Sequence, residues 1–354
     1  MSRFLNLRLE RLLPYTPGEQ PKIPGLIKLN TNESPYPPAP GVLDVINREE
    51  AAKLRLYSDP DATNLTAAIA AHYGVSPKQV VVGNGSDEIL AFAFAAFFDP
   101  AEKLLFPDIT YGFYPVFAEV FGLAPTVVPL KEDFTIDPSD YTGGNVVIAN
   151  PNAPTGLALT TSQIEEILKA NPNHLVLVDE AYADFGENCS ALPLLPKYEN
   201  LLIVRTCSKS RSLAGARLGY AIGHESVVAD LQKVRFSFNP YNVNRLTLLA
   251  GEASFADRAY FQSCIAKVKA TRARLTEGLR ALGFTALDSQ ANFVFAAHPA
   301  ETGATLLAKL RERRILVRHF AKPRIENFLR ITVGTDEETD VLLAALADIL
   351  KQRS

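Results

Sequence analysis

From residue 79 onward the chain alternates short β-branched apolar runs with longer helical stretches, and this alternation restricts its fold more than any other feature. The runs are apolar without a period of two, which is typical of strands buried on both faces. The sequence therefore predicts an α/β fold with a mostly parallel sheet flanked by helices. The clearest helix spans 162–170, where Ser162 and Glu165 have capping-box spacing. The expected strands are Val80–Val82, Lys103–Phe106, Thr126–Pro129, Asn145–Ala149, Leu175–Val178, Leu201–Arg205 and Leu218–Ile222.

The pattern differs on either side of this region. The first forty residues are rich in proline, and we expect extended or turn segments there rather than a regular element. After Tyr241 the chain predicts a smaller α+β unit. We therefore expect a large domain over residues 36–242 and a small domain made of residues 1–35 and 243–354. The small domain should contain helices over 243–256 and 257–282, a strand over 291–296, a helix ending near Arg314, strands over 315–318 and 328–333, and a helix over 336–351.

Composition narrows the class of protein. The 36 basic and 39 acidic residues give a net charge of −3, so no basic field attracts nucleic acid or an anionic membrane. Cys189, Cys207 and Cys264 show no paired spacing, which favours a reducing, cytoplasmic location. We find no secretion signal, and the longest apolar run, over 89–98, is well short of the about 20 residues of a membrane span. The five histidines are scattered, and we expect no metal site.

Polar residues follow four of the expected strands, where ligands bind in parallel α/β sheets. Gly83–Asp87 suits an anion at a helix start, although such turns are also glycine-rich for steric reasons. Asp179 could be functional, a helix cap or half of an ion pair. Lys209 could form a Schiff base or lie in a solvated loop. Asn150–Gly156 forms a rigid turn at the same edge. Their occurrence together indicates a ligand site.

These motifs resemble those of the fold type I pyridoxal-phosphate enzymes, specifically the class I and II aminotransferases. Within them the closest likeness is to the histidinol-phosphate aminotransferase family. The resemblance implies a pyridoxal 5′-phosphate cofactor, a homodimer with shared active sites, and amino transfer from histidinol phosphate to 2-oxoglutarate in histidine biosynthesis. The products would be imidazoleacetol phosphate and glutamate. The segments that carry the resemblance are Leu29–Glu33, Asn150–Gly156, Asp179–Tyr182, Ser208–Lys209 and Leu329–Gly334.

The resemblance also assigns catalytic roles. Lys209 would bind the cofactor aldehyde and then act as general base and acid. Asp179 would keep the ring nitrogen protonated, and Tyr182 would hydrogen-bond the phenolic oxygen of the ring. Tyr111 resembles the aromatic residue that stacks on the ring, and a tyrosine of the core is the alternative.

A phosphate site is implied as well. Tyr57 resembles a tyrosine that reaches the phosphate bound by the neighbouring subunit. Many relatives carry Asn directly before Pro-Thr-Gly, whereas this chain has Ala153, and we expect Asn152 to take over the contact with the ring oxygen. The residues expected around the phosphate are Ser86, Asp87, Thr206, Ser208 and Arg217.

The sequence indicates the substrate less clearly than it indicates the cofactor. Arg330, Arg318 and Tyr15 resemble groups that bind the anionic end of the substrate, although Arg318 could instead form a surface ion pair. An aromatic amino acid aminotransferase and a threonine-phosphate decarboxylase use the same cofactor apparatus and remain alternatives. A pyridoxal-phosphate-binding regulator is the non-enzyme alternative, but the N-terminus offers no room for a DNA-binding domain. A dinucleotide-binding module is excluded, since no G-x-G-x-x-G follows the first strand.

Overall fold

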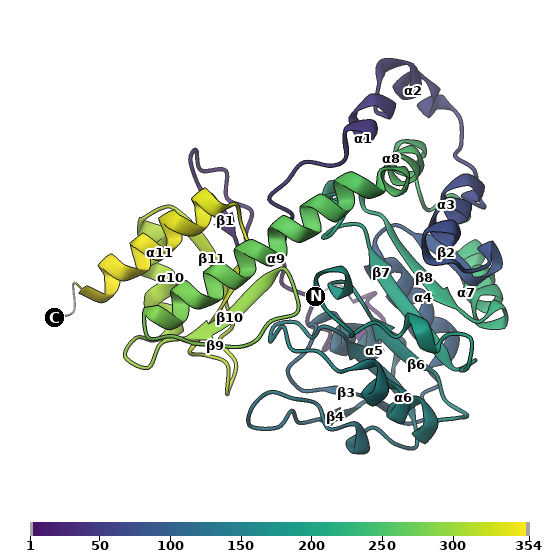
Figure 1. Cartoon of the computed structure of the whole chain (residues 1–354). Coiled ribbons are helices and arrows are strands. Elements are labelled where there is room, and N and C mark those ends of the chain that lie inside the picture. The colour runs from purple at the N-terminus through teal and green to yellow at the C-terminus, as the bar shows by residue number, and fades with distance from the viewer. Residues whose placement is uncertain (1–2, 352–354) are drawn as a thin grey trace.

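A computed structural model describes residues 3–351 and contains two β-sheets (Figure 1). In the larger sheet, every neighbouring pair is parallel except the two that include β8. The mostly parallel sheet predicted from the sequence is thereby confirmed. Its seven strands lie in the order β2 (Val80–Gly83), β8 (Gly219–Gly223), β7 (Leu201–Thr206), β6 (Val176–Asp179), β5 (Asn145–Ala149), β3 (Leu104–Pro107) and β4 (Thr126–Val128).

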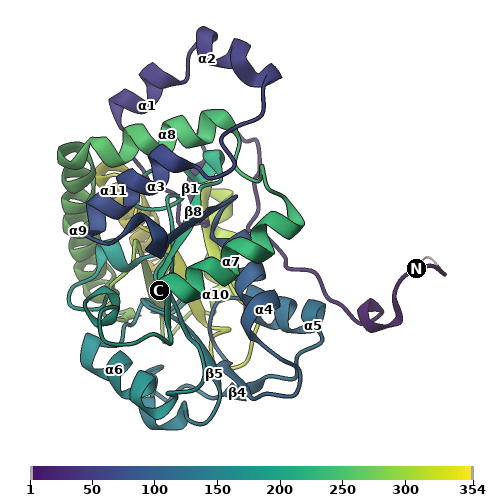
Figure 2. The ribbon, with the colours of Figure 1, turned by 90° about the vertical axis from the view of Figure 1, so that its right-hand side faces the viewer.

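Helices cover both faces of the larger sheet (Figure 2). Val146 and Ile148 of β5 lie in one apolar core, whereas Val147 between them lies in another. Because both faces are buried, the strands need no polar alternation, which explains their continuous apolar runs. The helices that share the first core are α3 (Thr63–Tyr73), α6 (Thr161–Ala170) and α8 (Arg245–Ala256). Those that share the second are α4 (Ser86–Phe97), α5 (Phe113–Phe121) and α7 (Glu225–Phe238).

The smaller sheet has its own apolar core, to which three further helices contribute. Long helix α9 runs from beside α8 to this smaller unit (Figure 1). The strands lie in the order β1 (Ile27–Leu29), β11 (Ile315–His319), β12 (Phe328–Thr332), β10 (Phe293–Ala297) and β9 (Thr285–Ala286). The helices are α9 (Arg258–Ala281), α10 (Gly303–Glu312) and α11 (Asp336–Lys351).

The remaining elements are short. Besides α1 (Pro40–Val45) and α2 (Arg48–Ala52), there are 3₁₀ turns at Leu7–Leu9, Lys53–Arg55, Pro77–Gln79, Pro138–Asp140, Ala183–Phe185, Leu192–Leu194 and Ala214–Ala216.

Within residues 3–351, no helix combines the length and apolar character that crossing a membrane requires.

Two local predictions are wrong. The proline-rich start does form a regular element, because Ile27–Leu29 pairs in parallel with β11. The capping box of α6 is made by Thr160 and Gln163, not by Ser162 and Glu165. The main-chain N–H of Thr160 donates to Gln163 Oε1 at 2.9 Å, and the Glu165 carboxylate instead accepts from the Tyr198 hydroxyl at 2.8 Å. The helix therefore begins at Thr161, one residue earlier than expected.

The packing of α8 bears on the division into domains. This helix follows the boundary expected at residue 242, yet Leu248 and Phe255 lie in the core shared with α3 and the larger sheet. The division into a large and a small domain remains our proposal. The packing of α8 favours a boundary after Ala256 rather than at residue 242.

Candidate active site

One edge of the larger sheet gathers the polar residues that follow its strands. β5, β6 and β7 are parallel, so their carboxyl ends meet at this edge. β8 runs in the opposite direction, and its first residue, Gly219, pairs with Thr206 at the end of β7. Arg217 therefore reaches the same edge as Asp179, although it precedes its strand rather than following it.

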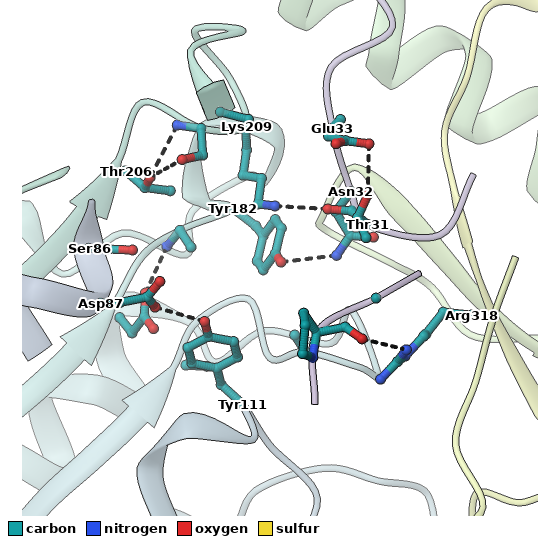
Figure 3. A pocket seen from close by; sticks show the side chains of 18 of the residues that line it. Thr31, Asn32, Glu33, Ser86, Asp87, Tyr111, Tyr182, Thr206, Lys209 and Arg318 are labelled. Atoms are coloured by element: carbon teal, nitrogen blue, oxygen red, sulfur yellow. Dashed lines mark hydrogen bonds between the residues drawn. The ribbon is translucent and has the colours of Figure 1, made fainter. Parts of the chain in front are cut away.

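A cavity of about 490 Å³ lies at this edge and extends to the smaller sheet. Both sheets and the N-terminal segment line it, and Figure 3 shows side chains of all three regions facing the same space. The structure thus brings together twelve of the residues that the sequence singled out. They are Tyr15, Ser86, Asp87, Tyr111, Asp179, Tyr182, Thr206, Ser208, Lys209, Arg217, Arg318 and Arg330.

Lys209 extends into the cavity from the loop after β7. Its Nζ donates to the main-chain oxygen of Thr31 at 3.0 Å (Figure 3). Burial, with a smaller contribution from the positive charge of Arg330, lowers the pKa of Lys209 to about 8. A lysine amine that loses its proton this readily is a nucleophile and a base near neutral pH.

Asp179 ends β6 with a buried carboxyl group. Its Oδ2 accepts a hydrogen bond from the hydroxyl of Tyr114 at 2.9 Å, and its Oδ1 accepts from the main-chain N–H of Ala181 at 3.2 Å. Burial nevertheless raises the pKa of Asp179 to about 7, because the charged form loses its hydration. A cation placed against this carboxyl would offset that loss, so the site is suited to a positively charged ring nitrogen.

Two tyrosines face the cavity from different sides. Tyr182 is buried, and its hydroxyl accepts a hydrogen bond from Asn32 Nδ2 at 3.0 Å. Burial raises the pKa of Tyr182, and the bond from Asn32 works against that rise. The hydroxyl of Tyr111 donates to Asp87 Oδ1 at 2.8 Å, and its ring lies 6.0 Å from that of Tyr15. This arrangement fixes the Tyr111 ring as one wall of the cavity.

The end of the cavity beside α4 is built to accept an anion. Ser86 is the first residue of α4, where main-chain N–H groups are unpaired and the helix dipole is positive. A Cβ at Gly219 would lie 2.2 Å from the nitrogen of Ser86, and one at Gly85 would lie 2.5 Å from Arg217 Nη2. The two glycines therefore permit β8 and Arg217 to approach the helix start. Hydroxyl groups of Thr206 and Ser208, 2.9 Å apart, complete this end.

The opposite wall carries two guanidinium groups from the smaller sheet. Arg318 of β11 and Arg330 of β12 are paired across the two strands. Arg330 Nη2 donates to the main-chain oxygen of Asn30 at 3.0 Å, whereas its Nε is buried and has no hydrogen-bond partner within residues 3–351. Arg318 donates to the main-chain oxygens of Thr16 and Pro17 over 3.3 and 3.5 Å. Weakly bonded and unpaired donors of this kind indicate a site for a carboxylate or phosphate.

Two predicted residues do not line the cavity. Asn152 is buried, and its Oδ1 accepts from Thr110 Oγ1, whereas its Nδ2 donates to the main-chain oxygen of Ile109 and to Thr155 Oγ1. Because these bonds occupy its amide, the expected contact between Asn152 and the ring oxygen is not available in this structure. Tyr57 is 81% exposed and stacks on Tyr241 with ring centroids 4.4 Å apart.

Sequence reasoning missed three contacts at the site. Thr31 supplies the oxygen that accepts from Lys209, Asn32 binds Tyr182, and Tyr114 binds Asp179. Asn32 stands within the Leu29–Glu33 motif, which was recognised only as a whole. Tyr114 lies in the first turn of α5, and its ring packs edge to face against that of Tyr111, with centroids 5.7 Å apart.

The residues that line the cavity fit pyridoxal phosphate in their charges and in their arrangement. An anion site, a lysine of lowered pKa and a buried carboxyl of raised pKa meet in one cavity. When bound, this cofactor supplies a cationic ring that withdraws electrons from the substrate carbon next to the transferred nitrogen. Fold and site together define a pyridoxal-phosphate-dependent enzyme.

Comparison with known proteins narrows this class. The profile of the family described as "Aminotransferase class I and II" matches residues 24–346. The chain is 52% identical to histidinol-phosphate aminotransferase 2 of Dechloromonas aromatica, over 99% of each chain. It is also 52% identical to the histidinol-phosphate aminotransferase of Gluconacetobacter diazotrophicus, over 100% of both. The chain belongs to the class I and II aminotransferase family.

A solved structure agrees with this assignment. The crystal structure of histidinol-phosphate aminotransferase from Sinorhizobium meliloti in complex with pyridoxal-5′-phosphate matches with a TM-score of 0.84 at 25% sequence identity. The match covers 93% of this chain and 92% of that chain. The fold class and the cofactor expected from the sequence are confirmed.

Proposed function

We propose that this chain transfers the amino group of histidinol phosphate to 2-oxoglutarate with pyridoxal phosphate as cofactor. The products are imidazoleacetol phosphate and glutamate, and the reaction is a step of histidine biosynthesis. The full-length relatives that carry this activity in their names support the proposal. The observation that carries it in the structure is the pair Arg318 and Arg330, which faces the same cavity as Lys209.

The two arginines suit both substrates. Histidinol phosphate brings a phosphate, and glutamate brings carboxylates, to the end of the cavity that the guanidinium groups line. Both anions accept forked hydrogen bonds from guanidinium groups, and these charge-assisted bonds are stronger than bonds to neutral acceptors. The present acceptors of Arg318 and Arg330 are main-chain oxygens of the N-terminal segment. A substrate anion can therefore replace them, whichever of the two substrates is bound.

Lys209 moves the proton. Its amine, with a pKa of about 8, is neutral in a substantial fraction of molecules near physiological pH. In that form it would accept a proton from the substrate carbon that bears the nitrogen, and as an ammonium it would return the proton to the carbon on the other side of that nitrogen. The main-chain oxygen of Thr31 holds the amine within the cavity. Asp179 balances the positive charge of the cofactor ring during this transfer.

A substrate panel tests this function. With glutamate as amino donor, we expect the highest kcat/KM for imidazoleacetol phosphate. A higher kcat/KM for phenylpyruvate would indicate an aromatic amino acid aminotransferase. Release of carbon dioxide from threonine phosphate would indicate the decarboxylase. A protein that binds the cofactor but turns over none of these substrates would indicate a regulator.

We also infer a homodimer in which Tyr57 reaches the partner's phosphate site. The support is a set of exposed apolar side chains on α1 and on the segment after α2, where Leu43, Leu54, Leu56 and Tyr57 are 61, 53, 51 and 81% exposed. Exposed apolar surface of this kind marks interfaces. Light scattering should give twice the mass of the chain, and Tyr57→Phe should weaken cofactor binding without dissociating the dimer. A monomer with full activity would contradict the inference.

A cytoplasmic location belongs to the same proposal. All three cysteines are free and buried, as expected for a protein of a reducing compartment. Partners of the proposed enzyme are small-molecule substrates and a second copy of the chain.

A further inference from the structure

Asn32 connects the smaller sheet to the hydroxyl of Tyr182. It lies in the N-terminal segment, its side chain is buried, and Nδ2 donates to the phenolic oxygen of Tyr182 at 3.0 Å. Figure 3 shows the amide of Asn32 pointing at the Tyr182 hydroxyl from the side opposite the strand ends. Asn32 lies in the motif Leu29–Glu33, but the sequence predicted no role for its side chain.

Three hydrogen bonds fix Asn32 in place. Its main-chain N–H donates to Thr332 Oγ1 at 3.0 Å, and the Thr332 hydroxyl donates in turn to Asn32 Oδ1 at 3.1 Å. The main-chain oxygen of Asn32 accepts from Asn292 Nδ2 at 3.0 Å. Its φ is 56°, in the left-handed region that asparagine tolerates better than most residues.

This network and the contact with Tyr182 use opposite ends of the amide. The Thr332 hydroxyl donates to Oδ1, and the NH₂ group is the end that points at the tyrosine. An amide NH₂ only donates, so the phenolic oxygen of Tyr182 acts as the acceptor. The tyrosine's own proton then remains free to be donated into the cavity.

On the side of the cavity that the turn at 150–156 lines, Ala153 and Asn152 offer no comparable donor. Ala153 lines the cavity and packs in the same apolar core as Tyr182, and its methyl group forms no hydrogen bond. The amide of neighbouring Asn152 is occupied by bonds with Ile109, Thr110 and Thr155. Any hydrogen bond from this part of the cavity to an oxygen of a bound ring must therefore come through Tyr182.

We propose that Asn32 is a positioning residue, which donates to the Tyr182 oxygen and thereby directs the Tyr182 proton to the phenolic oxygen of bound pyridoxal phosphate. The inference rests on the proposed cofactor. A donor bond to Tyr182 makes its hydroxyl more acidic and a stronger donor. A stronger bond to the ring oxygen makes that oxygen less basic, so the bound cofactor holds its proton less tightly.

The test uses the holoenzyme and the pH dependence of its visible absorption band. Asn32→Asp keeps the shape of the side chain but replaces the donor by an acceptor, which captures the Tyr182 proton. We expect the pKa of the band to rise by about 0.5–1 unit, the equivalent of one lost hydrogen bond. Asn32→Ala should shift it in the same direction. Thermal unfolding of each variant checks that it remains folded, and Asn30→Ala is the matched control, since Asn30 Nδ2 binds Glu19 instead.

A second pair of variants tests whether the effect passes through Tyr182. In a Tyr182→Phe background, Asn32→Asp should leave the pKa of the band unchanged, because the hydroxyl that transmits the effect is gone. Adding Ala153→Asn to Asn32→Ala should lower the pKa again by supplying a direct donor. An equal shift with and without the Tyr182 hydroxyl, or no shift in a folded Asn32→Asp variant, would overturn the proposal.

A measurement on the cofactor-free protein separates this inference from the proposed function. With 3-fluorotyrosine at position 182, the ¹⁹F signal reports the phenol pKa directly, and Asn32→Ala should raise it. If the wild-type protein gives no visible band with pyridoxal phosphate, the proposed function fails, whatever the fluorine signal shows. If the band forms and titrates identically in both proteins, only the inference about Asn32 fails.

Discussion

The two walls of the cavity hold their charged groups in different ways. On the larger-sheet wall, Asp179 and Arg217 each have a side-chain partner: Asp179 accepts from Tyr114, and Arg217 lies 3.4 Å from the Asp87 carboxylate. On the smaller-sheet wall, Arg318 and Arg330 bind main-chain oxygens of the N-terminal segment, and Arg330 Nε is buried without a hydrogen-bond partner among the described residues.

This difference corresponds to two kinds of ligand. A cofactor stays in place through every turnover, so its wall benefits from side chains fixed before it binds. The substrates alternate, and a wall that receives first one anion and then another needs donors whose present bonds are easily exchanged. We therefore expect substitutions on the larger-sheet wall to affect every substrate equally, and those on the smaller-sheet wall to act through substrate binding.

Lys209→Ala should have the largest effect of the variants. A small effect would contradict the comparison between the two walls. The variant removes both the amine that holds the cofactor and the base that moves the proton, so kcat should fall by about 10⁴-fold or more. The loss should be the same with imidazoleacetol phosphate and with 2-oxoglutarate. Single-turnover kinetics and borohydride treatment, which should no longer fix the cofactor to the protein, measure the two roles separately.

Lys209→Arg is the matched control, because it keeps a positive charge at the same place. It should be as inactive as Lys209→Ala, since a guanidinium neither loses its proton nor attacks the cofactor. Appreciable turnover in either variant would remove Lys209 from its proposed role.

Asp179→Asn should have the next largest effect. The amide cannot balance a cationic ring, and a loss of ~4 kcal/mol of transition-state stabilisation corresponds to about a thousandfold lower kcat. The cofactor should still bind, because the phosphate end is untouched. Steady-state rates with both acceptor substrates measure the effect, and a change under tenfold would argue against the assignment.

Asp179→Asn, which should lower kcat, should raise the free energy of unfolding of the cofactor-free protein. The pKa of Asp179 is about 7 in the folded protein against 3.8 for the free side chain, so the folded state holds the proton more tightly. The stability that this group contributes is complete below about pH 4 and is lost as the pH rises through about 7. Asparagine has no such dependence, so Asp179→Asn should raise the free energy of unfolding at pH 8, by roughly 2–4 kcal/mol, and change it little at pH 4. Urea unfolding at both pH values measures this.

Arg330→Ala and Arg318→Ala test the same comparison on the smaller-sheet wall. Arg330 is the more enclosed of the two and has the unpaired nitrogen, so its loss should lower kcat/KM by about a hundredfold. Arg318 has long bonds and is more exposed, and a loss of about tenfold is expected. The visible spectrum of the bound cofactor should be unchanged in Arg318→Ala. If each variant impaired only one of the two substrates, the arginines would be specialised rather than shared.

More of the fold than of the detailed site could be predicted from the sequence. Each of the seven strands of the larger sheet was predicted within two residues at either end, because burial on both faces leaves a continuous apolar run. Strand β1 was missed, because it has three residues and is stabilised by pairing with β11 at the far end of the sequence. Among the site residues recognised correctly, Asp179, Ser208 and Lys209 stand at or just after the ends of β6 and β7, where chain position alone places them at one edge.

The residues that were missed or misplaced depend on contacts between distant parts of the chain. Asn32 and Tyr182 are 150 residues apart, and Tyr114 and Asp179 are 65 residues apart, so no local sequence pattern predicts either contact. Asn152 was misplaced for the same reason. Besides Thr155 in its own turn, its amide binds Ile109 and Thr110, which lie 43 and 42 residues earlier in the chain, and the local order of residues does not show these distant partners.

Tyr114→Phe should have the smallest effect and tests how far the larger-sheet wall depends on side chains behind it. Removing the hydroxyl takes away the bond that favours the charged form of Asp179, so the pKa of Asp179 should rise further. One lost hydrogen bond of about 1 kcal/mol corresponds to a roughly fivefold lower kcat/KM, equal for both acceptor substrates. The matched control is Tyr141→Phe, because the Tyr141 hydroxyl is also buried but has no hydrogen-bond partner. That variant should retain full activity. Equal losses in the two variants would mean that packing, rather than the bond to Asp179, accounts for the effect, and the wall would then be less finely ordered than its hydrogen bonds indicate.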